Sequence, residues 1–358
     1  EVHPGHHSNC QPCHGQGGPA WRPGTERRNG EGGQGIDILI DILLLGFLVI
    51  IAVAAIRMRD LFAVAMMFGI YSLLTAALFM DLDAADVAFT EAAVGAGVTT
   101  ILLLSSLRLT GRWERRPKHS PVLPLVVVGV TGAALIYGTL DIPSLGDPEA
   151  PAHQHVAPHY IENAPKEMGI PNIVTAVLAS YRGFDTLGET LVIFTAGLGV
   201  FLLLGTNDGA RPRPGQTAIG SQPVLRLVVK VLIPFILLYA LYVQLHGEYG
   251  AGGGFQAGVI FATGMVLYDL VFGDGDARLV VPARWLPRLA AFGVLVYGSV
   301  GLYALLHGRP FLDYTVLAED PVAGRHLGIL LVELGIGICV FAIVLSIFYA
   351  LSGRSRQP

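Results

Sequence analysis

Long uncharged apolar runs alternate with short polar stretches along almost the whole chain. The hydrocarbon core of a bilayer takes about 20 helical residues, and about nine runs approach this length. They are residues 42–56, 61–80, 92–107, 122–140, 190–206, 231–245, 255–268, 289–306 and 327–351. This pattern predicts an all-α integral membrane protein with about nine transmembrane helices in a lipid bilayer.

The seventh run is short and follows a cluster of glycines. Five glycines lie between Gly247 and Gly254, and a helix with so many glycines is not stable. Backbone that leaves the helix inside a membrane must pack within protein or line a cavity, because lipid cannot satisfy its polar groups. The sequence therefore predicts a broken or re-entrant element before residues 255–268.

Composition supports this class and excludes several others. The chain of 358 residues is 53% hydrophobic and 14% charged, with a mean hydropathy of +0.58. Its 23 Lys and Arg against 27 Asp and Glu give no basic excess, so we expect no nucleic-acid partner. We find no catalytic triad, Walker loop, zinc motif or dinucleotide fingerprint in a plausible context, and we expect no enzyme chemistry.

Residues 1–35 differ from the rest, because they are rich in Gly, His, Pro and Arg and have no apolar period. We expect a disordered arm there. The arm contains Cys10, Cys13 and His14 in the spacing that attaches c-type haem. Since few residues are available to cover a porphyrin, we expect no cofactor and keep haem as the alternative.

Two polar linkers divide the remainder into three segments, 36–118, 119–214 and 215–358. The first linker reads GRWERRPKHS and the second GTNDGARPRPGQ. Each segment brings an ionisable group to the edge or interior of a span. A charge in hydrocarbon costs about 3 kcal/mol or more unless it meets a partner or water, so these groups are the functional candidates.

In the first segment, Asp86 and Glu91 stand at the entrance to the third span, followed by Gly95 and Gly97. The glycines permit close approach of a neighbouring helix or a local irregularity. Glu91 is therefore either a buried functional acid or an acid that anchors the span at the interface.

In the second segment, Asp185 and Glu189 are four residues apart and share a helix face with Arg182. In the third, Lys230 interrupts an apolar run, and Glu333 lies one to two turns inside the last span, seven residues after His326. Lys230 and Glu333 can pair or face one water path, or Lys230 can extend to the membrane surface.

Four sequence stretches resemble three domains of a known family. DAADVAFTEAAVGAGVTT is similar to the D-like domain of hydrogenase complexes (DUF4040), and NIVTAVLASYRGFDTLGETLVIFTAGLGV to the E-like domain that follows it at the C-terminal end of the Mrp antiporter A subunit. LHGEYGAGGGFQAGVIFA and RHLGILLVELGIGICV resemble the Mrp antiporter B subunit. Together these matches cover nearly everything after residue 35.

The resemblance implies an accessory subunit of a multisubunit monovalent cation/proton antiporter rather than a self-sufficient transporter. It points to Glu91 and Glu189 as ion-path acids, with Asp86 and Asp185 as lesser candidates, and to Gly252, Gly253, Gly254 and Phe255 as a structural motif. Implied partners are other membrane subunits of an Mrp-like or hydrogenase-like complex and Na⁺ or H⁺. The alternative is a scaffold subunit of a hydrogenase-like or complex I-like pump that binds no ion itself.

The basic residues predict the orientation in a bacterial or archaeal cell membrane. Fifteen of the 23 Lys and Arg fall in one set of alternate loops and seven in the other. By the positive-inside rule the N-terminus lies outside and the C-terminus in the cytoplasm.

We expect single cysteines in a cysteine-free background to report this orientation. Ser144→Cys, in the loop 141–166, reacts with a membrane-impermeant maleimide added from outside, and Ser120→Cys reacts only after the membrane is opened. Labelling of Ser144→Cys from the cytoplasmic side alone would reverse the topology.

Overall fold

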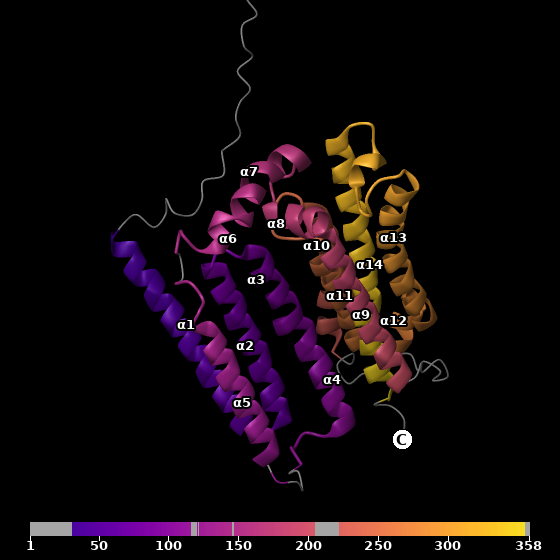
Figure 1. Ribbon diagram of the computed structural model, residues 1–358. Coiled ribbons are helices and arrows are strands. Elements are labelled where there is room, and N and C mark those ends of the chain that lie inside the picture. Colours follow the sequence, from indigo (N-terminus) through magenta and orange to yellow (C-terminus); the bar gives the residue numbers. More distant parts are fainter. Residues whose placement is uncertain (1–30, 116–119, 121, 145–146, 205–221, 355–358) are drawn as a thin grey trace, which may run out of the picture. The chain divides into compact units, whose positions relative to one another are not determined.

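The computed structural model describes residues 31–115, 120, 122–144, 147–204 and 222–354. The chain divides into two compact units, Glu1–Leu43 and Leu44–Pro358. The second unit contains the candidate ion-path residues of all three segments. Its described residues are almost entirely helical (Figure 1).

Nine helices among the described residues are long and apolar enough to cross a membrane, which confirms the predicted fold class. They span Ile38–Arg57, Leu61–Asp81, Ala85–Thr110, Val122–Thr139, Gly183–Leu204, Pro223–His246, Gly254–Phe272, Ala283–Leu306 and Pro321–Ser352. Most extend past the predicted runs, because a single charged or polar residue near a helix end does not stop the helix. Thus Asp185 and Glu189 lie inside the fifth span rather than before it.

The first segment holds α1 (Glu31–Arg57), α2 (Leu61–Asp81) and a third span built from α3 (Ala85–Glu91), η2 (Ala92–Thr99) and α4 (Thr100–Thr110). The η2 stretch is π-helical, the local irregularity that its glycines permit. A Cβ at Gly95 would strike the Ser72 side chain, so α2 packs closely there. In Figure 1 the third span runs beside α2.

The second segment begins with α5 (Val122–Thr139) and ends with α9 (Gly183–Leu204). Between them lie α6 (Pro151–Gln154), α7 (Val156–Met168), α8 (Ile173–Ala176) and the π-helical η3 (Val177–Tyr181). Asn172 caps α8, since its side-chain oxygen accepts from the amides of Val174 and Thr175. The short elements α7, α8 and η3 pack on α14 or on one another.

The third segment contains α10 (Pro223–His246), α11 (Gly254–Phe272), α12 (Asp274–Val280), η5 (Ala283–Trp285), α13 (Leu286–Leu306), η6 (Tyr314–Leu317) and α14 (Pro321–Arg354). The predicted glycine break is the loop 247–253 between α10 and α11. The helix after it is 19 residues long, so the break joins two full-length helices.

Helix α14 is the centre of this segment, and it packs most extensively against α13 and α11. Glycines bring the backbones together. A Cβ on Gly258 of α11 would meet the Gly337 carbonyl oxygen at 2.6 Å, and one on Gly293 of α13 would meet the Cys339 amide nitrogen at 2.7 Å. Glycine at these positions lets the helices approach more closely than any side chain would allow.

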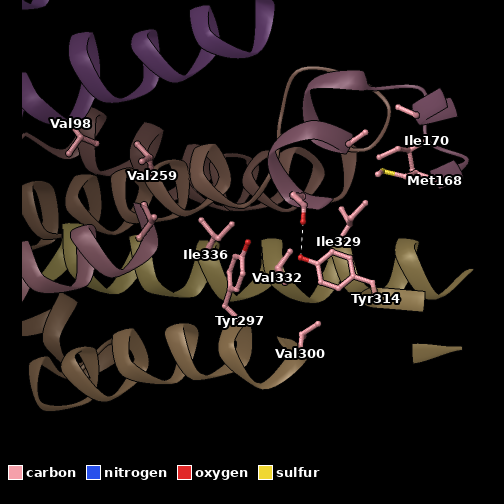
Figure 2. Close-up of a cluster of buried hydrophobic side chains, with 14 residues drawn as sticks. Val98, Met168, Ile170, Val259, Tyr297, Val300, Tyr314, Ile329, Val332 and Ile336 are labelled. Carbon is pink, nitrogen blue, oxygen red and sulfur yellow. Dashed lines mark hydrogen bonds between the residues drawn. The ribbon is translucent and has the colours of Figure 1, made fainter. Parts of the chain in front are cut away.

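A buried cluster joins all three segments (Figure 2). It includes Val98 of η2, Met168 of α7, and Tyr314 and Ile336 of the third segment. The Tyr314 hydroxyl donates to the Ala179 carbonyl at 2.7 Å, the dashed line in Figure 2, and the Tyr297 hydroxyl donates to the Gly183 carbonyl at 2.6 Å. Desolvation by burial raises the pKa of Tyr314, so this hydroxyl remains a donor at neutral pH.

An ion pair holds the end of the third span against the start of α2. Asp60 caps α2, and Arg112 donates to its carboxylate from Nε at 2.9 Å and Nη2 at 2.5 Å. The hydrogen bond from Arg112 holds the pKa of Asp60 below its usual range. The pair fastens the end of the third span to the start of α2.

The glycine contacts generate a matched stability test on α13. We expect Gly293→Ala to lower the melting temperature of the detergent-solubilised chain, because its Cβ meets backbone atoms that cannot move aside; overpacking of this kind costs about 1–3 kcal/mol. Gly298→Ala on the same helix has nothing within 4 Å and serves as the control. Equal melting temperatures would contradict the close-packing account.

Candidate functional site

A cavity of about 350 Å³ lies where the three segments meet. Its walls come from α3, from α8 to α9, from the glycine loop with the start of α11, and from α14. One carboxylate from each segment lines it: Asp86, Glu189 and Glu333. The cavity thus brings together three of the six predicted ion-path residues.

Glu333 is the most buried of the three acids, with 7% of the residue exposed. Among the described residues, none donates a hydrogen bond to its carboxylate or forms an ion pair with it. Its Oε1 lies against the glycine loop, 3.1 Å and 3.2 Å from where a Cβ of Gly247 or Gly253 would stand. Larger residues there would displace the carboxylate.

The glycines of the motif allow close approach of the backbone. Gly253 has φ +120, a region that favours glycine. A Cβ on Gly254 would strike the Glu333 carbonyl, so the start of α11 rests on the α14 backbone. Phe255 lines the cavity beside them.

Asp86 faces the same loop from the first segment. Its Oδ1 accepts long hydrogen bonds from the Gly252 amide at 3.4 Å and from Asn172 Nδ2 at 3.5 Å. Beside it, Gln256 Nε2 donates to Thr90 Oγ1 at 2.8 Å. These contacts tie α3 to the loop and to α11, which gives Asp86 a structural role as well as a place in the cavity wall.

Asn172 holds the glycine loop from the second segment. Its Nδ2 donates to the carbonyls of Gly247 at 2.9 Å and Gly250 at 3.0 Å, and its backbone amide donates to the Glu248 carbonyl at 3.1 Å. Thr175 Oγ1 donates to the Gly247 carbonyl at 2.7 Å. A loop without regular secondary structure thereby obtains partners for its buried carbonyls.

Glu189 reaches the cavity from α9, whereas Asp185 does not line it. Asp185 forms an exposed ion pair with Arg182, at 2.6 Å, one turn closer to the helix start. The expected cluster of one cation and two anions is thus divided: Asp185 is neutralised at the helix end, and Glu189 faces the cavity.

Glu91 lies outside the cavity lining. Its Oε1 is 2.6 Å from where a Cβ of Gly95 would stand, and the Ser72 side chain of α2 crowds the same point. The carboxylate therefore faces α2 along the π-helical stretch. A Glu91 role in an ion path would place that path between α2 and the third span.

Lys230 does not pair with Glu333, which corrects that part of the sequence interpretation. Lys230 is exposed on α10, and sixteen residues separate it from His246, beside the loop that contacts Glu333. At 1.5 Å per residue this is roughly 24 Å along the helix. Cys10, Cys13 and His14 lie outside the described residues.

Sequence reasoning missed several polar residues at the site, among them Thr90, Asn172, Thr175 and Gln256. The available signal was their position inside otherwise apolar motifs. Asn172 in particular follows Pro171 and precedes a run of β-branched residues, an arrangement typical of a helix cap.

Family comparisons match all three segments. The MbhD family, the D subunit of MBH, matches residues 46–112, and the MbhE family, the E subunit of MBH, matches 116–223. The "Domain related to MnhB subunit of Na+/H+ antiporter" matches 224–346. The fold and the cavity define a polytopic helical membrane protein in which acids of three segments meet.

The chain belongs to the Mrp-type antiporter subunit family. It is 32% identical over 133 residues to the putative antiporter subunit mnhB2 of Staphylococcus aureus and covers 94% of that protein. It is 27% identical over 329 residues to a probable K⁺/H⁺ antiporter A/B subunit of Rhizobium meliloti, which aligns with 80% of this chain.

A solved structure, that of the Mrp complex from Dietzia sp. DQ12-45-1b, matches with a TM-score of 0.67 and 26% identity over 88% of this chain. The chain spans 35% of that structure's chain and 31% of the Rhizobium protein. It thus corresponds to about a third of each of these longer relatives.

We expect Asn172→Asp to destabilise the folded chain strongly. The aspartate keeps the oxygen that caps α8 but loses the donors to two loop carbonyls and adds a negative charge near Asp86; each lost buried hydrogen bond costs about 1–3 kcal/mol. Asn163→Asp, whose amide donates to the His159 carbonyl on the surface of α7, is the control. Equal melting temperatures would show that Asn172 does not hold the loop.

Proposed function

We propose that this chain is an accessory membrane subunit of a multisubunit monovalent cation/proton antiporter, and that its cavity holds a proton or a cation during transport. The observation that carries the proposal is the meeting of Asp86, Glu189 and Glu333 in one cavity. The antiporter subunits among its relatives support the class.

The electrostatics of the cavity favour an exchangeable positive charge. Asp86, Glu189 and Glu333 line one cavity; Glu333 is buried, whereas Glu189 is exposed. Negative charges that line one cavity disfavour the ionised state of one another, most strongly for the buried acid. A proton or a monovalent cation relieves that repulsion. The oxygens of Thr90, Thr175 and Thr190 add neutral ligands of the kind that replace a cation's water shell.

Companion subunits are part of the proposal. The matching Dietzia structure is of a complex, and this chain corresponds to about a third of the aligned chain there. Helix α5 is exposed along nearly its whole apolar length, so its surface contacts lipid or other membrane subunits. The other ion-handling sites then lie in those subunits.

A scaffold without ion binding is the second candidate, and one observation favours it. Asp86 accepts hydrogen bonds from the glycine loop and from Asn172, as a purely structural acid would. Glu333 and Glu189 lack such partners among the described residues, so they discriminate between the two functions.

We expect Glu333→Gln and Glu189→Gln each to reduce cation/proton exchange roughly tenfold or more, because glutamine keeps the shape of glutamate but exchanges no proton and carries no charge. Exchange is measured with Na⁺ and with K⁺ in membrane vesicles that contain the chain and its companion subunits. Assembly is measured on a native gel.

Asp83→Asn and Asp147→Asn are the controls. Both side chains are outside the cavity lining, and asparagine tolerates the positive φ of Asp83 and can accept the Glu149 amide as Asp147 does. Normal exchange in the Glu333 and Glu189 variants, or loss caused only by failed assembly, would favour the scaffold. Loss of exchange in the Glu91→Gln variant alone would indicate that the ion path runs between α2 and the third span.

A further inference from the structure

His326 and Glu248 form a partly buried pair beside the cavity that the proposed function does not use. His326 Nδ1 lies 3.1 Å from Glu248 Oε2, and their side chains are 34% and 17% exposed. His326 belongs to the second turn of α14 and Glu248 to the glycine loop. The pair therefore combines access to water with a fixed hydrogen-bond geometry.

The pair lies about two helical turns from Glu333, toward the start of α14. His326 and Glu333 are seven residues apart on α14, about 10 Å along one helix face. Glu248 adjoins Gly247, whose Cβ position is 3.1 Å from Glu333 Oε1. A histidine–carboxylate pair thus lies between the start of α14 and the most buried acid of the cavity.

Residues at the end of α7 pack against the pair. His326 Nε2 is 3.2 Å from the Cβ position of Gly169, at the end of α7. The neighbouring Arg325 is engaged elsewhere, because it donates to the Glu167 carbonyl. The Glu167 carboxylate accepts from Tyr181, whose pKa is raised to about 12 by burial and by Glu167. The charged groups on the elements packed around the pair are Arg325 and Glu167 on the α7 side, and Asp86 and Glu333 on the cavity side.

We propose that His326 and Glu248 form a proton relay that connects the water at the start of α14 with Glu333. This inference rests on the proposed function, since it supplies the proton route to the same cavity. An imidazole is suited to the role because it changes charge between about pH 5 and 8.

The steps balance as proton transfers alone. Neutral His326 accepts a proton from water at one ring nitrogen and donates the proton at Nδ1 to the Glu248 carboxylate, which leaves the imidazole neutral in its other tautomer. Glu248 then gives its proton through water to ionised Glu333. Rotation of the imidazole ring restores the first tautomer for the next proton, and Glu333 gives up its proton when a cation enters the cavity.

Chemical rescue tests the relay. We expect His326→Ala and His326→Gln to slow exchange about tenfold or more, and added imidazole to restore His326→Ala severalfold, because the partly exposed site admits a free base. Cation uptake is measured in vesicles of the assembled complex, with imidazole equilibrated on both sides so that it sets up no pH gradient.

His307→Ala is the matched control. This histidine lies at the end of α13, where its ring nitrogen contacts the Tyr303 carbonyl oxygen at 2.9 Å. We expect normal exchange and no response to imidazole. Full exchange in His326→Gln, or a defect in His326→Ala that imidazole does not change, would show a structural role and overturn the relay.

A double variant tests the second step. In His326→Ala with Glu248→Gln we expect no rescue by imidazole, because glutamine cannot pass a proton on. Rescue equal to that of His326→Ala would remove Glu248 from the route. If the Glu333→Gln and Glu189→Gln variants transport normally, the proposed function fails. If these two variants lose exchange while the His326 variants keep it, only the relay is overturned.

Discussion

The site depends on the contact between the glycine loop 247–253 and α14 at Glu333. The absence of side chains at Gly247 and Gly253 leaves room for the carboxylate, and Gly254 lets α11 begin on the α14 backbone. Asn172, Thr175 and Asp86 then hold the loop from the other two segments. A buried acid without an ion-pair partner is costly, so this framework must be rigid enough to keep it in place.

That constraint explains why the polar residues of the site are distributed as they are. Backbone carbonyls of the loop need donors because no helix satisfies them. Asn172 and Thr175 supply those donors. The same few hydrogen bonds therefore hold the loop and shape the cavity wall.

Much of this fold follows from the sequence because apolar runs of bilayer length specify spans directly. The nine spans, the π-helical irregularity at Gly95 and the glycine break were all predictable. The cavity was not, since helix periodicity does not say which helices meet: Glu91 and Glu189 looked equivalent, yet only Glu189 faces the cavity. The predicted run 255–268 ended before Asp269, yet α11 continues to Phe272 and Asp269 is buried within it, because tertiary packing can cover an acid that hydropathy counts as exposed.

The covalent continuity of the three segments has its own consequence. Each contributes one cavity acid, so in separate polypeptides the site would form only after two association steps, at the dilute concentrations of a membrane. In one chain those steps become intramolecular, with effective concentrations of about millimolar for short linkers. Synthesis of one chain supplies the three acids in equal numbers. Unequal expression of separate subunits therefore cannot produce a cavity that lacks one of them.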